Sequence, residues 1–282
     1  MDYVYEFWMR SFSEFLGIAL LILLGNGVVA AVSFKRMSAN QPGKYVLVAF
    51  AWGLAVFLGA LVSSSLNGYG HLNPALTLMD IIVSSKKEVI IDNSIYTLAV
   101  AAFNVSYTRA YIIVFFVFLM FQLSGAMFGQ IVLNFINFKF LKDKENDIFT
   151  IRNMHCTTPV YKNKEDKATI FNFAYELVGT MVLLGVILAL GSNVFGNIQL
   201  GKLEGVAVFF LVSAIGMSLG AATGYAINPA RDFGPRIIYW LTIKKFRKDD
   251  VVAKFANWNY AWVPVLAPLV AGIIVGIFGI IK

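Results

Sequence analysis

Six apolar stretches, each long enough to cross a lipid bilayer as a helix, constrain the fold of this chain more than any other feature. They lie near residues 12–34, 44–66, 109–137, 169–191, 203–222 and 259–281. About 18 consecutive apolar residues suffice to span the hydrocarbon core of a bilayer. With 59% hydrophobic and 14% charged residues, the chain also lies outside the range of soluble globular domains. The sequence therefore predicts an all-α membrane protein with six transmembrane helices.

The charges and the single cysteine narrow the possible partners and cofactors. The net charge of +7 comes partly from short basic loops such as 162–167 and 244–250. We therefore expect the lipid bilayer and water as partners, and no nucleic acid. Cys156 cannot form an intramolecular disulfide or a cysteine-based metal site, and we expect a free loop thiol. Because the sequence has no nucleotide-binding glycine loop, metal cluster or nucleophile–base motif, we expect no enzyme activity, no cofactor and no metal.

The two halves of the chain repeat one another. The stretch SEFLGIALLILLG at 13–25 resembles YELVGTMVLLGVI at 175–187, and both place a glutamate, Glu14 or Glu176, near the start of a span. Each half has three spans, so the second copy must enter the membrane from the opposite side. We expect a single channel domain over 1–282, with inverted repeats at about 10–137 and 169–281 and a polar linker at 138–168. The segment 84–108 is too short to span and is expected on the membrane surface.

Each half also contains an Asn-Pro-Ala tripeptide inside an apolar region. Asparagine favours the position just before a helix, and proline favours the first helical position. The apolar stretches that follow, 76–83 and 231–240, cover about half a bilayer at roughly 1.5 Å per residue. A backbone end at that depth is tolerated where it lines a water-filled cavity, so two re-entrant half-helices meeting at a pore are predicted. The motifs are Asn73-Pro74-Ala75 and Asn228-Pro229-Ala230.

The polar groups at this predicted pore suit small neutral solutes. The half-helix starts direct their positive dipole ends to the centre, and Asn73 and Asn228 can donate side-chain amides to a passing hydroxyl. Arg231 follows Asn228 by three residues and therefore lies on the same helix face. An arginine at membrane depth is costly and normally marks a transport pathway. These groups are expected to repel protons and cations.

Paired Asn-Pro-Ala motifs in inverted halves of three spans resemble the aquaporin family, over nearly the whole chain from Glu14 to the region of Pro264. The resemblance implies a homotetramer in the plasma membrane, with a pore in each subunit and both termini cytoplasmic. It implies that Arg231 belongs to an outer constriction together with Trp52, Gly216 and Tyr225. This set resembles the glycerol facilitators (aquaglyceroporins), as does Asp232.

Two departures from the glycerol facilitators bear on this constriction. Tyr225 stands where bacterial facilitators commonly have phenylalanine, and its hydroxyl could narrow the pore or change its hydrogen bonding. Trp52 lies 21 residues before Asn73, one more than in the family. A kink or bulge near 63–70 is expected to absorb that residue; otherwise Phe50 or Phe57 would face the pore.

Four further residues have two interpretations each. Glu14 and Glu176 could form a proton relay, but their repeated placement resembles the family's structural glutamates, which accept backbone N–H bonds, and bracing is the favoured interpretation. Asp232 could brace the turn through loop backbone or simply lie exposed at the half-helix start. His71 could hydrogen-bond a solute or cap a loop carbonyl.

The expected function is passive diffusion of glycerol and related small neutral solutes, with water, while protons and ions are excluded. A water-selective pore and a secondary transporter with broken helices are the alternatives.

The distribution of charges opposes the membrane orientation that the resemblance implies. The loops that would face outward hold 17 lysines and arginines, and the inner ones hold six, the reverse of the positive-inside rule.

Overall fold

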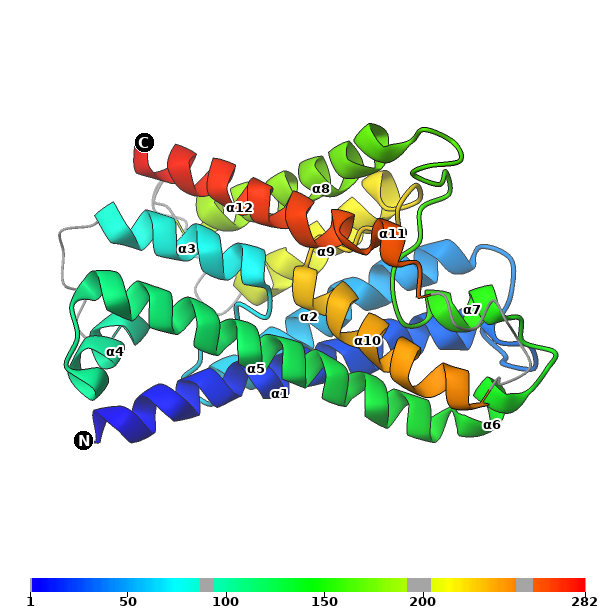
Figure 1. Cartoon of the computed structure of the whole chain (residues 1–282), viewed down its shortest axis with the longest axis horizontal. Helices are drawn as coiled ribbons and strands as arrows, with labels where there is room; N and C mark the ends of the chain where they lie inside the picture. The colour runs from blue at the N-terminus through cyan, green and yellow to red at the C-terminus, as the bar shows by residue number, and fades with distance from the viewer. Residues whose placement is uncertain (1, 87–93, 192–203, 247–255, 282) are drawn as a thin grey trace.

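A computed structural model describes residues 2–86, 94–191, 204–246 and 256–281 of the protein. All regular structure in these residues is helical (Figure 1). The helices are α1 (Tyr3–Ser33), α2 (Lys44–Ser65), α3 (Pro74–Lys86), α4 (Ile95–Phe103), α5 (Tyr107–Ile136), α6 (Phe138–Lys142), α7 (Ile148–Asn153), α8 (Thr169–Leu190), α9 (Glu204–Leu219), α10 (Pro229–Phe246), α11 (Trp258–Ala261) and α12 (Val263–Ile281).

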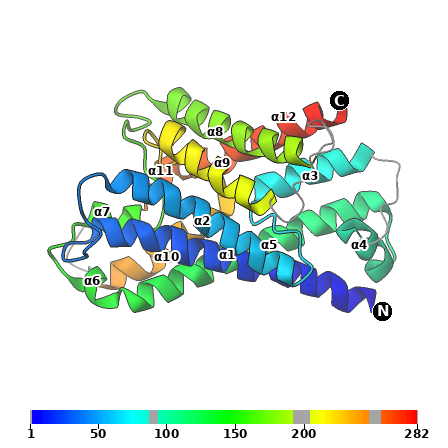
Figure 2. The same ribbon diagram turned by 180° about the vertical axis from the view of Figure 1, so that it is seen from behind.

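The long apolar helices match the predicted spans closely. Helices α1, α2, α5 and α8, and α11 together with α12, are long and apolar enough to cross a membrane. The fifth predicted span, 203–222, corresponds to α9, which has 16 residues and begins directly after residues that the structure does not describe. Both termini lie at the same end of the bundle, as an even number of crossings requires (Figures 1 and 2).

Helix α1 begins earlier than its apolar stretch suggests. It starts at Tyr3, where Asp2 caps it by accepting hydrogen bonds from the next backbone N–H groups, and Glu6 pairs with Arg10 one turn apart. These local contacts satisfy the polar residues of the first turns, so the helix extends beyond the apolar region.

The two Asn-Pro-Ala motifs begin helices, as predicted. Helix α3 has 13 residues and spans about 20 Å, which fits half a bilayer. Helix α10 has 18 residues and is longer than the 231–240 stretch predicted for it. The extra length has a packing reason, because Tyr239 and Ile243 are buried in a cluster with Leu133 of α5 and Ile151 of α7.

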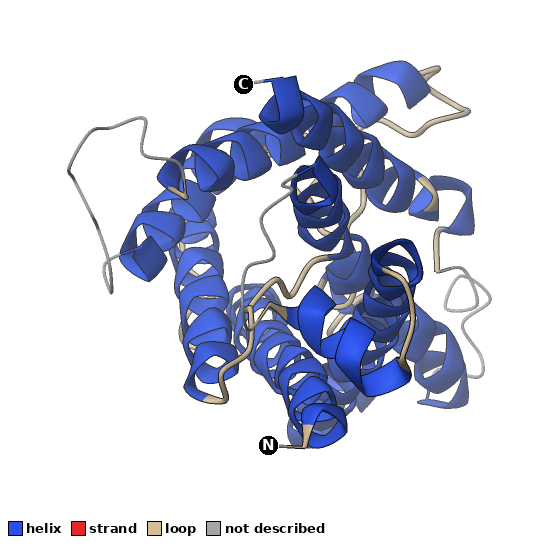
Figure 3. Ribbon diagram, turned by 90° about the vertical axis from the view of Figure 1, so that its left-hand side faces the viewer, coloured by secondary structure: helices blue, strands red, loops and turns tan. Residues whose placement is uncertain are grey.

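The half-helices pack across the two halves of the chain. Helix α3 packs against α12 and α10 packs against α5, while α2 and α9 contact each other between the halves. Figure 3 views the bundle from the end that carries both termini and shows the helices arranged around a central region. The re-entrant helix of each half therefore packs against a membrane-spanning helix of the other half.

Small residues of the third spans allow this close packing. A Cβ atom at Gly272 of α12 would lie 2.6 Å from the carbonyl oxygen of Ala75, at the start of α3. Real Cβ atoms do not approach a backbone oxygen this closely, so a glycine is required for α3 to sit against α12.

Two segments outside the spans have more structure than predicted. Within 84–108, residues 87–93 lie outside the described residues, and the apolar part forms α4, which packs on α1 and α5 with Ile95 and Ala99 buried. Its position on a membrane surface stays a prediction. The linker 138–168 contains α6 and α7, because Leu141, Ile148 and Ile151 find apolar partners in the cluster described above.

Candidate pore and selectivity site

The two asparagines of the motifs lie side by side and are joined by crossed hydrogen bonds. Asn73 Nδ2 donates to the carbonyl of Ile227 at 2.8 Å, and Asn228 Nδ2 donates to the carbonyl of Leu72 at 2.7 Å. Each Oδ1 accepts the backbone N–H of the alanine two residues on. Because an amide nitrogen carries two hydrogens, each asparagine retains a second donor hydrogen. Both asparagines line the central cavity.

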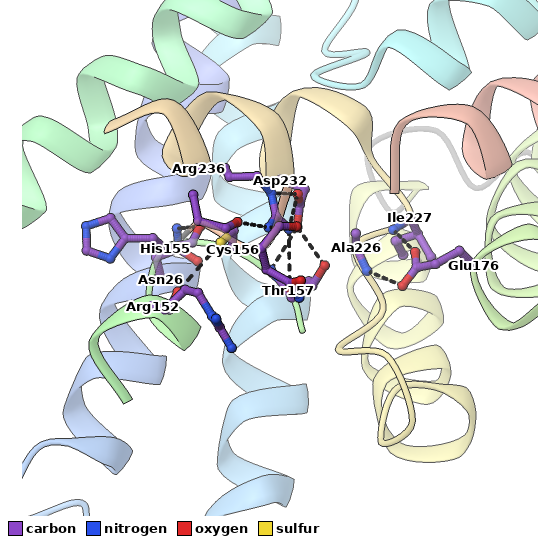
Figure 4. Close-up of polar contacts among 12 residues, drawn as sticks. Asn26, Arg152, His155, Cys156, Thr157, Glu176, Ala226, Ile227, Asp232 and Arg236 are labelled. Carbon is purple, nitrogen blue, oxygen red and sulfur yellow. Dashed lines mark hydrogen bonds and ion pairs between the residues drawn. The ribbon is translucent and has the colours of Figure 1, made fainter. Parts of the chain in front are cut away.

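The residue before each asparagine has a left-handed backbone. Leu72 has φ 51° and Ile227 has φ 43°, values that cost a non-glycine residue about 1–2 kcal/mol. Glu14 accepts hydrogen bonds from Leu72 N at 2.6 Å and His71 N at 2.9 Å. Glu176 does the same for Ile227 N at 2.9 Å and the preceding N–H at 3.1 Å. The two carboxylates thus make the contacts expected of bracing groups, and Figure 4 shows the Glu176 pair.

A cavity of about 930 Å³ runs past the asparagines. Its polar and aromatic lining residues include Trp52, Tyr225 and Arg231, and also His71 and Asp80. Most of the remaining wall is aliphatic, with residues from α1, α2, α8, α9 and α12. The apolar lining residues include Leu21, Val56, Leu183, Ile187, Leu188, Val208, Val212 and Val275.

Trp52 and Arg231 face one another in this cavity. The Arg231 guanidinium carbon lies 4.0 Å from the centroid of the Trp52 ring, within cation–π distance. The guanidinium donates no hydrogen bond to another residue among those described, so its donors are available to a molecule in the cavity. One face of the passage is therefore aromatic, and the other presents hydrogen-bond donors.

Neither alternative to Trp52 takes its place. Phe50 is 44% exposed and packs edge-on against Phe209, and Phe57 lies against Gly205. After α2 ends at Ser65, Asn67 and Gly70 adopt positive φ values of 57° and 63°. That this region absorbs the extra residue stays a prediction. The departure from helical backbone lies within the predicted 63–70 region.

Gly216 contributes to the cavity indirectly. It is not among the residues that line the cavity, and a Cβ at this position would lie 2.9 Å from Tyr225 Cζ. The space that Gly216 leaves is therefore filled by the Tyr225 ring. Within the described part of the chain the buried Tyr225 hydroxyl has no hydrogen-bond partner.

Asp232 and Arg236 tie α10 to two distant segments (Figure 4). Asp232 is fully buried, so the interpretation of an exposed side chain is wrong. It accepts hydrogen bonds from Thr157 N at 2.7 Å and Thr157 Oγ1 at 2.6 Å, and it pairs with Arg236 at 2.7 Å. Arg236 also donates to the Thr157 carbonyl at 2.9 Å and to carbonyls at 256–257. The sequence analysis did not predict a role for Thr157, because no pattern in the neighbouring sequence indicates its contact with Asp232.

His155 and Cys156, which precede Thr157, are also buried, and Figure 4 shows both side chains. Asn26 of α1 donates to the His155 carbonyl at 3.2 Å, which ties the linker to α1, and to Gln130 of α5 at 2.7 Å. Cys156 is free, as predicted, but it is only 1% exposed and burial raises its pKa to about 11. Burial lowers the pKa of His155 to about 4. Both side chains are therefore neutral near pH 7.

Two re-entrant half-helices, joined at their tips beside an amphipathic passage through a bundle of membrane-spanning helices, define a membrane channel. The sequence profile of the Major intrinsic protein family matches residues 3–99 and 93–278. The chain belongs to the major intrinsic protein family.

Named relatives and a solved structure resemble the chain over nearly its full length. It is 40% identical over 270 residues to the "Probable glycerol uptake facilitator protein" of Mycoplasmoides gallisepticum, covering 95% of each chain. It is 35% identical to the "Glycerol uptake facilitator protein" of Streptococcus pneumoniae R6, covering 92% of this chain and 93% of the relative. The X-ray structure of the aquaglyceroporin from Plasmodium falciparum matches with a TM-score of 0.70 and 27% identity, covering 96% and 95% of the two chains.

Proposed function

We propose that this protein is a passive channel through which glycerol and related small neutral solutes, together with water, cross the membrane. The observation that carries the proposal is the pairing of Trp52 with Arg231 across the cavity, at 4.0 Å. An aromatic face suits the carbon chain of a polyol, and the planar guanidinium can donate to two hydroxyls at once. Relatives named as glycerol uptake facilitators support the same choice of solute.

The path of the solute would pass three groups of polar residues. Trp52, Tyr225 and Arg231 would form the constriction, with Gly216 holding the space behind Tyr225. The second amide hydrogens of Asn73 and Asn228 would receive a hydroxyl at the centre. Ion exclusion would come from the positive ends of α3 and α10 and from the charge of Arg231. This role involves no covalent chemistry, and we propose no enzyme activity or cofactor.

The proposal includes an assembly and a location. By family resemblance we propose a homotetramer in the plasma membrane, each subunit with its own pore, and cytoplasmic termini. Exposed apolar residues are abundant on the outward surfaces of the spans, which suits contact with lipid and with neighbouring subunits. The mass of the detergent-solubilised complex, measured by light scattering with the detergent contribution subtracted, tests the subunit number.

A permeability panel tests the function. Purified protein in proteoliposomes is exposed to gradients of water, glycerol, urea and longer polyols, and volume is followed by stopped-flow light scattering. Glycerol entry above that of protein-free vesicles, unaffected by proton or sodium gradients, is expected. Water flux without glycerol entry would favour the water-selective pore, and gradient-dependent, saturable uptake would favour the secondary transporter.

A further inference from the structure

The two aromatic side chains of the constriction are supported by different helices. Trp52 belongs to α2, whereas the Tyr225 ring fills the space that Gly216 leaves in the last turn of α9. A Cβ atom at Gly220, directly after α9, would lie 2.3 Å from Tyr225 Cδ1, so the ring also packs against the residue that follows the helix. The width of the passage between Trp52 and Tyr225 therefore depends on how closely α2 and the end of α9 are held together.

One face of α2 packs directly against α9 (Figure 2). Tyr45, Ala49 and Gly53 follow one another at intervals of four residues and so lie on the same face of the helix. A Cβ atom at Gly53 would lie 2.5 Å from the Phe209 carbonyl oxygen, and one at Gly216 would lie 2.9 Å from Ala49 Cβ. The two helices are thus already in close contact, and α9 cannot move nearer to α2.

Tyr45 adds a hydrogen bond to this contact at the start of α2. Its hydroxyl donates to the carbonyl oxygen of Gly216 at 2.8 Å. A Cβ atom at Gly220 would lie 2.6 Å from the same hydroxyl, so Tyr45 reaches the end of α9 beside the Tyr225 ring. Tyr45 is 38% exposed and is not among the residues that line the cavity. It therefore ties α2 to the backbone behind Tyr225 from outside the passage.

Helix α2 connects this hydrogen bond to the opposite side of the constriction. Trp52 follows Tyr45 by seven residues, which is two turns, or roughly 10 Å, along the helix. Residues at this spacing lie on the same side of a helix. Because one rigid element carries both residues, a bond from Tyr45 to the end of α9 also fixes Trp52 relative to the backbone that supports Tyr225.

We propose that Tyr45 is a positioning residue that sets the width of the constriction and thereby the size limit for solutes. Its hydrogen bond holds the end of α9 against α2. Without that bond the end of α9 can move only away from α2, because Ala49 and Gly216 already pack closely. The space behind Tyr225 would then enlarge, and the ring would withdraw from the passage. The natural solute in this inference rests on the proposed function, but the size limit is measurable with any neutral solute.

Permeability to two polyols of different length tests this role. Tyr45→Phe keeps the ring and removes only the hydroxyl. Proteoliposomes with this variant and with the wild type are compared by stopped-flow light scattering, using glycerol and erythritol, a four-carbon polyol. The ratio of erythritol to glycerol permeability is expected to rise about two- to tenfold, the range that corresponds to the loss of one neutral hydrogen bond. Because both solutes are measured on the same vesicles, misfolded protein lowers both fluxes and leaves the ratio unchanged.

The matched control is Tyr111→Phe. The Tyr111 hydroxyl of α5 also donates to a backbone carbonyl of another helix, that of Ser84 in α3, at 3.2 Å, and its ring packs against Tyr96 of α4. Its loss removes the same kind of bond away from the constriction and should leave the ratio unchanged. An unchanged or lower ratio in Tyr45→Phe, or an equal rise in the control, would overturn the role of Tyr45.

The same measurements separate this role from the proposed function. A wild-type protein that passes water but neither polyol would contradict the proposed function. In that case, glycerol entry through Tyr45→Phe and not through Tyr111→Phe would still support the positioning role. Exclusion of glycerol by both variants would overturn it.

Discussion

At the residue scale, the shape of the constriction depends on a missing side chain. Replacing Gly216 with alanine would place a Cβ 2.9 Å from both Tyr225 Cζ and Ala49 Cβ. The Tyr225 ring must then move toward the cavity, with an overpacking cost of about 1–3 kcal/mol. We expect Gly216→Ala to reduce glycerol permeability more than water permeability in proteoliposomes. Gly27→Ala is the control, since its Cβ would meet only Leu133 at 3.8 Å. Unchanged glycerol flux in Gly216→Ala would contradict this placement of Tyr225.

A second residue-scale prediction concerns the buried imidazole of the linker. His155 donates from Nδ1 to the Ile151 carbonyl, and its Nε2 has no partner within the described residues. Burial lowers its pKa from 6.5 to about 4, so the unfolded chain binds the proton more readily than the folded one. The contribution of neutral His155 to the free energy of unfolding is therefore fully present above pH 6.5. It is lost as the pH falls toward 4, and the total loss is about 3 kcal/mol.

Thermal unfolding in detergent between pH 7.5 and 4.5 measures this effect. The wild-type protein should lose more stability than His155→Gln over this range, because glutamine does not titrate. The difference between the two profiles isolates His155 from other acidic and basic groups. Parallel profiles for the two proteins would show that the imidazole is not buried in its neutral form.

At the element scale, the entry into α10 depends on one carboxylate. Glu176 uses both oxygens to accept the N–H groups of Ala226 and Ile227, and a glutamine offers only one oxygen. Glu176→Gln should therefore lower the free energy of unfolding by about 1–3 kcal/mol, measured by thermal or denaturant unfolding in detergent. A proton relay would instead leave stability near that of the wild type and make flux depend on a proton gradient. Glu165→Gln serves as the control for loss of charge.

The helices were predictable where a local sequence pattern determines them. Apolar length located α1, α2, α5, α8 and α12, and the Asn-Pro pairs located the starts of α3 and α10. The short linker helices were not predicted, since α6 and α7 have five and six residues and depend on packing with distant helices. The length of α10 was underestimated for the same reason.

The site was predictable only in part. The predicted inverted repeat indicated that Asn73 and Asn228 meet, although the Asn73–Ile227 hydrogen bond joins residues 154 positions apart. The sequence did not indicate Thr157 as the partner of Asp232, because the contact crosses from the linker to α10.

At the scale of the whole molecule, the charge distribution and the family resemblance disagree about orientation. The linker 138–168 would face outward if the termini are cytoplasmic, and cysteine labelling distinguishes the two orientations. The native Cys156 gives little background, because it is 1% exposed and burial raises its pKa to about 11, which disfavours the reactive thiolate.

A membrane-impermeant maleimide applied to intact cells is the measurement. Glu165→Cys, at an exposed linker position, should be labelled in intact cells. Tyr3→Cys, at the exposed start of α1, should be labelled only after the cells are permeabilised. The opposite pattern would place the termini outside and make the charge rule the better guide.

We interpret the whole molecule as a channel whose pore passes the tips of two half-helices. Hydrogen bonds from the side-chain amides of Asn73 and Asn228 join these tips. Glycerol entry into proteoliposomes, followed by stopped-flow light scattering with membrane conductance recorded in parallel, tests this claim most directly. The account predicts glycerol entry well above that of protein-free vesicles, independent of proton and sodium gradients, with no added ion conductance. Entry no faster than in protein-free vesicles, or entry that requires an ion gradient, would contradict it.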